Sequence, residues 1–282
     1  MTGSSTIAST LLDLGTAATA AGFDPTAVLD HVKDGELAFG QSWWYSIGLT
    51  KMTFMFLLAG LLTILFFWSH ARTAGKRKVP SRWGAFVESI ILFIRDQMTR
   101  PFLGEEGDRF VPFVTSLFVF IAICNLLGMV PFFDALGHGG NTATGNIVLT
   151  ASLAICAFSY YHFHGIREQG LFTYVKNIFP HVPAFVLPVI VVVEILAHIV
   201  KPCALAIRLF ANMFAGHTMM AVLLAFTNVL SADLPVGLAV SIPCFLAATA
   251  LSFLELLVAL IQAFVFAFLT TVFLAGAIHP EH

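Results

Sequence analysis

Two apolar stretches near the C-terminal end of the chain are too long for a single upright crossing of a lipid bilayer. They cover residues 183–230 and 236–278. At a rise of 1.5 Å per residue, each would form a helix about 65–70 Å long, more than twice the ~30 Å hydrocarbon thickness of a bilayer. The sequence therefore predicts that these segments tilt steeply, break, or form two crossings each.

The overall composition indicates an integral membrane protein. Hydrophobic residues make up 58% of the chain and charged residues only 11%, with a mean hydropathy of +0.89, whereas roughly 25% of residues are charged in a soluble domain. The net charge of -2 gives no reason to expect nucleic acid binding. The four cysteines lie in apolar runs without CxxC or Cys/His spacing, so we expect no metal, no cofactor and no disulfide framework.

The first part of the chain is predicted to be a tail followed by one membrane span. Residues 1–46 form the tail, and 47–69 form the span. The segment after the span, "HARTAGKRKVPSR", holds five basic residues and no acidic one. By the positive-inside rule this end faces the cytoplasm and the tail lies outside. The tail lacks the basic start of a signal peptide, so cleavage is not expected.

Between this span and the two long stretches, the sequence predicts a surface helix and a hairpin. Residues 83–98 are apolar on one helical face but too charged for a span, which is typical of an interfacial helix. Residues 110–162 contain two apolar runs around the Gly-rich turn "DALGHGGNTATG". The expected fold class is therefore all-α integral membrane, with a channel domain at 47–282 and the C-terminus in the cytoplasm.

The first long stretch carries charged residues at helical spacing. A charge inside the membrane costs roughly 2.5–3.5 kcal/mol on insertion scales, so it indicates function. Offsets of 0, 4, 7, 14 and 18 fall on one helical face, and the residues at these offsets are Glu194, His198, Lys201, Arg208 and Asn212. His217 lies off this stripe and should face a different neighbour.

The second long stretch carries Glu255 and Gln262, seven residues apart and therefore on one face. If the two stretches fold back on each other, His217 and Glu255 can meet. Such a pair can relay protons, because both groups change protonation near neutral pH when their surroundings tune them. Arg208 cannot deprotonate, so it can hold a carboxylate in its ionised form without carrying the proton itself.

Structural roles are the alternative for several of these residues. Lys201 could snorkel or mark the inner end of a broken helix, and Glu194 with His198 could be a structural pair. Asn212 could hold helices together. We expect no metal at "HFH", residues 162–164, in a predicted cytoplasmic loop. For Arg208 no acid lies within a turn on its own helix, so its partner must come from elsewhere.

Several motifs resemble one family. They are "KPCALAIRLFANMFAGH" followed by "LELLVALIQAFVFAFLTTVFLA", together with "VPSRWGAFVESI", "CNLLGMVPF", "GNIVLTAS" and the terminal "HPEH". In this order they resemble the a subunit of F-type ATP synthases, the stator channel that faces the rotating ring of c subunits. The resemblance implies one outer span, an interfacial helix, a two-span hairpin and two long, strongly tilted helices packed along the ring.

The resemblance also implies two offset aqueous half-channels, with Arg208 separating them and ejecting the proton from each arriving ring carboxylate. The outer half-channel would be lined by Asn212, His217, Glu255, Gln262 and Asn125, with Thr150 as a further candidate, and the inner one by Glu194. His217 and Glu255 are exchanged relative to many bacterial members, and position 128 is Gly where some relatives have an acid. His198 has no counterpart role in the resemblance.

The expected partners are the c-subunit ring, the b-subunit peripheral stalk, the remaining ATP synthase subunits, the lipid bilayer and protons. The expected location is a bacterial inner membrane, with the mitochondrial inner membrane as the alternative. A rival hypothesis is a proton-coupled secondary transporter with an intramembrane Glu/His/Arg relay. It is disfavoured because the sequence shows no paired repeats or matching helix interruptions. A membrane hydrolase or redox protein would need a metal or nucleophile cluster that the spans lack.

Overall fold

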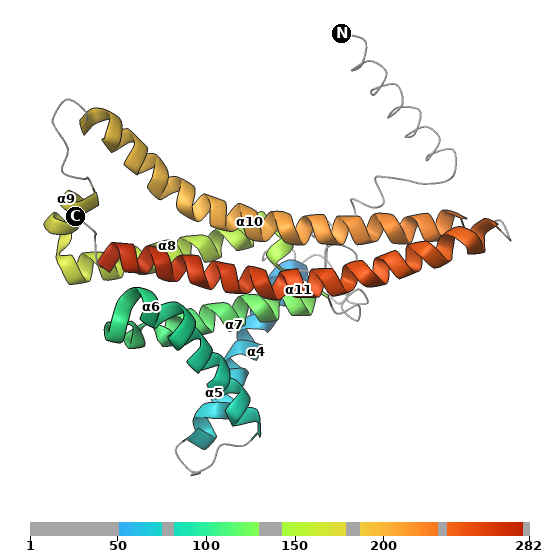
Figure 1. Ribbon diagram of the computed structural model, residues 1–282, viewed down its shortest axis with the longest axis horizontal. Helices are drawn as coiled ribbons and strands as arrows, with labels where there is room; N and C mark the ends of the chain where they lie inside the picture. Colours follow the sequence, from blue (N-terminus) through green and yellow to red (C-terminus); the bar gives the residue numbers. More distant parts are fainter. Residues whose placement is uncertain (1–50, 75–81, 130–142, 179–186, 231–235, 279–282) are drawn as a thin grey trace, which may run out of the picture.

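The computed structural model describes residues 51–74, 82–129, 143–178, 187–230 and 236–278 (Figure 1). The predicted tail at 1–46, most of the basic cluster after the first span and most of the Gly-rich turn lie outside these ranges. Regular structure in the described residues is helical throughout. Four of the described helices are long and apolar enough to cross a membrane, which confirms the prediction of an all-α membrane protein.

The two long apolar stretches form two unbroken helices. Helix α10 spans Leu187–Leu230 and helix α11 spans Val236–Ile278, with 44 and 43 residues. Pro202 and Pro243 lie inside them, yet neither proline ends its helix. Of the alternatives left open by length alone, breakage is therefore excluded. In Figure 1 the two helices run side by side over much of their length, while the N-terminal part of α10 curves away from α11.

Four contacts fix the antiparallel register of α10 and α11. Gly216 lies against the carboxyl group of Glu255, and the hydroxyl of Ser252 donates to Sδ of Met220 at 3.1 Å. Nearer the other end, Nζ of Lys201 lies 5.5 Å from the ring centroid of Phe273. Between these contacts, Leu205 and Leu209 of α10 belong to the same core cluster as Ala263 and Phe266 of α11. The turn of α10 that carries Arg208 therefore lies beside the turn of α11 that carries Gln262.

A hairpin of two apolar helices packs against this pair. Helix α7 (Val111–Gly128) contacts α11, and helix α8 (Ile147–Gln169) contacts both α10 and α11. Asn146 caps α8, because its side-chain oxygen accepts from the backbone N–H of Val148 at 2.9 Å. Helix α8 extends past the predicted end of the hairpin at residue 162, and it ends where Gly170 adopts a φ of 80°. The "HFH" residues consequently lie in a helix and not in a loop.

The end of α8 is tied to the end of α11. The side-chain amide of Gln169 donates to the carbonyl of Ala277 at 2.8 Å, which satisfies one of the carbonyls left free at a helix C-terminus. A bare glycine is needed at position 165, because a Cβ there would lie 2.8 Å from the same carbonyl oxygen. The short helix α9 (Leu171–Ile178) follows and lies close to α8.

The helices at the predicted first span and the predicted interfacial helix form an arm below the hairpin in Figure 1. Helix α4 (Lys51–Ala74) has an apolar segment at Thr53–Trp68 and packs on α7, with the rings of Phe56 and Phe120 5.0 Å apart. Helix α5 (Arg82–Ile94) corresponds to the predicted interfacial helix. Its inner face contributes Ile94 to a buried cluster that also contains Ala267 of α11.

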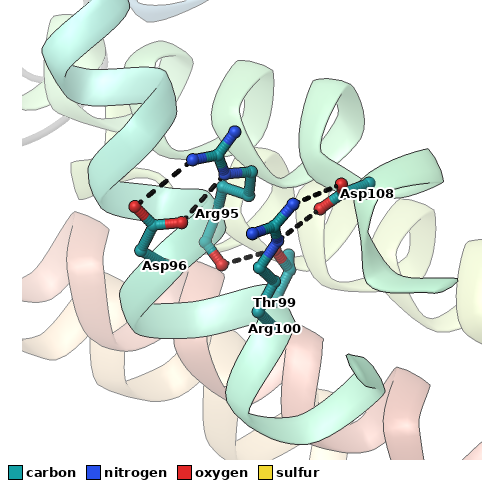
Figure 2. A network of polar contacts seen from close by, with 5 residues as sticks. All are labelled: Arg95, Asp96, Thr99, Arg100 and Asp108. Atoms are coloured by element: carbon teal, nitrogen blue, oxygen red, sulfur yellow. Dashed lines mark hydrogen bonds and ion pairs between the residues drawn. The ribbon is translucent and has the colours of Figure 1, made fainter. Parts of the chain in front are cut away.

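A polar turn connects α5 to α7. It consists of η1 (Arg95–Thr99), α6 (Arg100–Leu103) and η2 (Gly104–Arg109). Figure 2 shows Arg100 reaching both carboxylate oxygens of Asp108, at 2.9 and 2.8 Å, and Arg95 reaching the neighbouring Asp96 at 2.8 Å. The bond from Arg100 holds the pKa of the Asp108 carboxyl below its ordinary value. The turn is therefore closed by ion pairs within itself, at a place where it is open to water.

Candidate functional site

Arg208 lies on an exposed face of α10, among small side chains. Ala204, Ala211 and Ala215 are also exposed and follow at the same helical spacing, so they form one stripe with the arginine. No described residue forms a hydrogen bond or ion pair with Arg208. Small residues allow another helix to approach closely within a membrane. The chain thus presents a permanent positive charge on a surface suited to a neighbouring helix.

Glu255 lies to one side of Arg208 along the helix pair, and it is buried. Only 8% of its surface is exposed, and its carboxyl group packs against the backbone of Gly216, where a Cβ would lie 2.7 Å from Oε1. Gln262, two turns further along α11, is also buried at 7% exposure. The seven-residue spacing therefore directs both side chains to the protein side of α11, as predicted.

Asn125 joins the hairpin to the same face of α11. It is fully buried, and its amide nitrogen donates to the carbonyl of Ala259 at 3.0 Å. Ala259 lies one turn from both Glu255 and Gln262, so Asn125 sits between them. The amide oxygen of Asn125 accepts from the hydroxyl of Thr144 at 2.8 Å. Asn125 therefore fixes the register of α11 against α7 at the point where these two polar residues face the protein.

The other predicted site residues Thr150, Glu194 and His217 differ from Glu255, Gln262 and Asn125 in what the structure describes of them. Thr150 is buried, but its hydroxyl donates to the carbonyls of Ile147 and Asn146, one turn earlier on its own helix. Helix α10 passes through both Glu194 and His217, but their side chains lie outside what the structure describes. His217 follows Gly216, so the helix register places it at the level of Glu255. The predicted relay between the two remains a prediction.

Towards the start of α10 the structure brings together residues that the sequence did not connect. His198 packs its ring against that of His162 on α8, with centroids 5.5 Å apart. Nδ1 of His162 is hydrogen-bonded to the hydroxyl of Tyr174 on α9 at 2.5 Å. The stripe on α10 had singled out His198, but the spacing along the chain gave no signal for its partners on α8 and α9.

The structure also distinguishes between the alternatives for Lys201. Its ammonium group lies over the ring of Phe273, which is a cation–π arrangement. Helix α10 continues without a break through the following Pro202. Lys201 therefore packs against α11 and does not mark the end of a broken helix.

The described residues hold no group of three or more His, Cys, Asp or Glu side chains placed to bind a metal ion. In particular, His164 is hydrogen-bonded through Nδ1 to the carbonyl of Tyr160 at 3.0 Å. Tyr160 lies four residues earlier on α8. His164 is on a different face of α8 from the ring contact between His162 and His198.

Comparisons with known proteins agree with this geometry. The family model described as "ATP synthase A chain" matches residues 52–275. The chain is 37% identical over 244 residues to the ATP synthase subunit a of Maricaulis maris, covering 86% of this chain and 93% of the relative. It is 40% identical over 240 residues to the ATP synthase subunit a of Myxococcus xanthus, covering 84% and 75%. A third relative, from Afipia carboxidovorans, is 34% identical and covers 90% and 94%. The chain therefore belongs to the ATP synthase subunit a family.

Proposed function

We propose that this chain is the proton-translocating stator subunit of an F-type ATP synthase. It provides two half-channels that load and unload a carboxylate on the ring of c subunits, and so couples proton flow to rotation. The observation that carries the proposal is Arg208, a permanent cation exposed on an apolar helix, among small residues and without a partner in the described part of the chain. Its counter-charge comes from a carboxylate on another subunit.

Arg208 divides the polar residues of the helix pair into two groups. Glu255 lies on one side of it, at the level of Gly216, and Lys201 and His198 lie on the other. We assign His217, Glu255, Gln262, Asn212 and Asn125 to the outer half-channel and Glu194 to the inner one. A proton that crosses 100 mV releases about 2.3 kcal/mol. A continuous path past Arg208 would dissipate this energy, which is why a group that cannot carry a proton stands between the two halves.

The proposed arrangement in the membrane follows from helix length and from charge. Segment 47–69 is the outer span, 83–98 an interfacial helix and 110–162 the core of the hairpin, with α10 and α11 strongly inclined. The tail at 1–46 lies outside and the C-terminus in the cytoplasm. The relatives named above are bacterial, which supports a location in a bacterial inner membrane.

The proposed partners follow from the exposed surfaces. The stripe around Arg208 faces the c-subunit ring. The b subunits of the peripheral stalk and the remaining ATP synthase subunits complete the machine, and lipid covers the other apolar faces. The rival hypothesis of a secondary transporter is not favoured, because the helices α10 and α11 are unbroken where transporters of that kind place interrupted helices around a substrate site.

The test is ATP-driven proton pumping by the complete ATP synthase in vesicles. Arg208→Ala is expected to abolish pumping, while Arg167→Ala, which removes an exposed arginine at the end of α8, leaves it unchanged. Arg208→Lys is expected to impair coupling, because lysine loses its proton in a desolvated site. ATP hydrolysis measured in parallel shows whether the complex has assembled. Normal pumping by the Arg208→Ala complex would contradict the proposed function.

A further inference from the structure

Three aromatic residues meet where α8, α9 and α10 come together, and we refer to them as the inner cluster: His162, Tyr174 and His198. The hydroxyl of Tyr174 is hydrogen-bonded to Nδ1 of His162. The rings of His162 and His198 lie 5.5 Å apart at an angle of 31°. The resemblance to the family gives none of these residues a role. Each group can donate and accept a proton, so the contacts form a potential chain for one.

The second ring nitrogen of His162 makes this arrangement unusual. Its Nε2 is buried and has no hydrogen-bond partner among the described residues, and the same holds for the hydroxyl of the adjacent Tyr161. A buried polar atom without a partner costs about 1–3 kcal/mol, so such atoms are rare in folded proteins and call for a reason. Two of them on neighbouring residues mark a place where water or a proton can be received.

The position of the inner cluster along α10 links it to the proposed proton path. His198 lies one turn beyond Glu194 and one turn before Lys201, on the stripe that continues to Arg208. The ammonium group of Lys201 lies over the ring of Phe273 of α11. The cluster is therefore on the Glu194 side of Arg208, where the inner half-channel is proposed to run.

We propose that His162 is a proton relay of the inner half-channel, which passes protons between His198 and Tyr174. In one tautomer, the Nδ1–H of His162 donates to the hydroxyl oxygen of Tyr174, and the lone pair on Nε2 is free. A proton from the side of His198 binds Nε2, directly or through a water molecule, and the ring becomes an imidazolium. The Nδ1 proton then moves to the Tyr174 oxygen, whose own proton leaves on the far side. One proton enters and one departs, and rotation of the imidazole ring and of the Tyr174 hydroxyl then prepares His162 to accept the next proton without a proton moving back.

Tyr174 can take part in this exchange while it remains neutral. Burial raises the pKa of Tyr174 to about 12, so its hydroxyl keeps its proton and exchanges it without becoming a phenolate. The described titratable groups that face His162 are Tyr161 on α8, Tyr174 on α9, and His198 and Lys201 on α10. Helix α11 contributes the aromatic ring of Phe273.

The experiment compares two histidine variants in the complete ATP synthase. His162→Gln keeps a polar side chain of similar size that cannot carry a proton, and His164→Gln is the matched control on the same helix. We expect ATP-driven pumping by His162→Gln to fall about tenfold, below the ~100-fold or more that a proton-transfer group can contribute, because water partly bypasses it. His164→Gln should pump like the unaltered enzyme. Added imidazole should restore pumping in His162→Ala, which a purely structural role would not allow.

This inference rests on the proposed function, and Arg208→Ala separates the two. If Arg208→Ala still pumps, the proposed function fails. If it does not pump while His162→Gln matches His164→Gln, only the relay is overturned. Absence of imidazole rescue in an assembled His162→Ala complex also overturns it. Should His162→Gln fail to assemble, Tyr174→Phe decides, because it removes only the hydroxyl. Pumping at the unaltered rate would refute the relay, and a several-fold loss would support it.

Discussion

Replacing Gly216 with alanine should impair proton transfer without weakening the fold. Gly216 lies in the interior of α10, facing Glu255 of α11. A Cβ at this position would lie 2.7 Å from Oε1 and 3.1 Å from Cδ of Glu255. Since ordinary contacts begin at 3.4 Å, the carboxyl oxygen must move by about 0.7 Å. The atom that must move is the end of a flexible side chain, so the displacement itself is inexpensive.

The predicted signs of the two effects are opposite. Alanine inside a helix is more favourable than glycine by about 1 kcal/mol, so the stability of α10 should be unchanged or slightly higher. Transfer of a proton depends strongly on geometry, and a displacement of about 1 Å can cost up to ~100-fold in rate. For a shift of about 0.7 Å in one carboxylate, we expect ATP-driven pumping to fall by about three- to tenfold. The variant should therefore lose pumping activity without losing stability.

The assay is pumping by the complete ATP synthase in vesicles, together with the thermal unfolding temperature of the solubilised complex. Gly276→Ala is a matched control in α11, because a Cβ there meets no atom within 4 Å. It should leave both pumping and assembly unchanged. Adding Glu255→Asp to Gly216→Ala shortens the carboxylate side chain and makes room for the new methyl group. The double variant should therefore lose less pumping activity than the two single variants lose in total.

Two results would refute this reasoning. Pumping at the unaltered rate by Gly216→Ala would show that the position of the Glu255 carboxyl does not matter at the scale of the contact. Strictly additive losses in the double variant would show that position 216 acts on pumping by some route other than Glu255.

Two further predictions concern the hairpin and the polar turn. Asn125→Ala should lower the stability of the solubilised complex by about 1–2 kcal/mol, since interhelical hydrogen bonds in membrane proteins contribute about 0.6 kcal/mol each on average and a small cavity adds to this loss. Thr144→Val removes only one of these bonds, and an equal loss in both variants would contradict the account. Asp108→Asn should lower the unfolding temperature most at neutral pH. Because the folded-state pKa of Asp108 is lowered, its stabilisation is present above the unfolded pKa and disappears as the pH falls through the folded pKa. A difference between Asp108→Asn and the unaltered chain that persists at acid pH would exclude the ion pair as its cause.

The long helices illustrate what the sequence could and could not predict. Residues 236–278 were expected as one apolar stretch, and α11 has the same limits. The apolar run contains no signal that distinguishes one inclined helix from two crossings, because both bury the same side chains. That choice depends on how the segment packs against α7, α8 and α10. By contrast, the sequence does not predict the end of α8 at Gly170, because the histidines and charges after residue 162 are typical of a loop.

The candidate site was predictable where it follows helical spacing. Glu255 and Gln262 were placed on one face by their separation alone, and both are buried there. The bond from Asn125 to the carbonyl of Ala259 was not predictable, because it joins residues 134 positions apart through a backbone atom that carries no sequence signal. The contact of His162 with His198 was not predictable either, because it joins the side chains of two different helices. The residue pattern within one helix predicts only which side chains share a face of that helix, whereas these contacts depend on the relative register of different helices.

The position of Arg208 along α10 supports the proposal that one arginine separates two proton paths. The residues assigned to these paths on α10 run from Glu194 to His217, and Arg208 lies 14 residues from the first and nine from the second. At 1.5 Å per residue these separations are about 21 Å and 14 Å, so each is shorter than the ~30 Å hydrocarbon layer even for an upright helix. In the proposed arrangement each path therefore needs water access through only part of the membrane, and the two paths lie on opposite sides of a side chain that cannot release its proton.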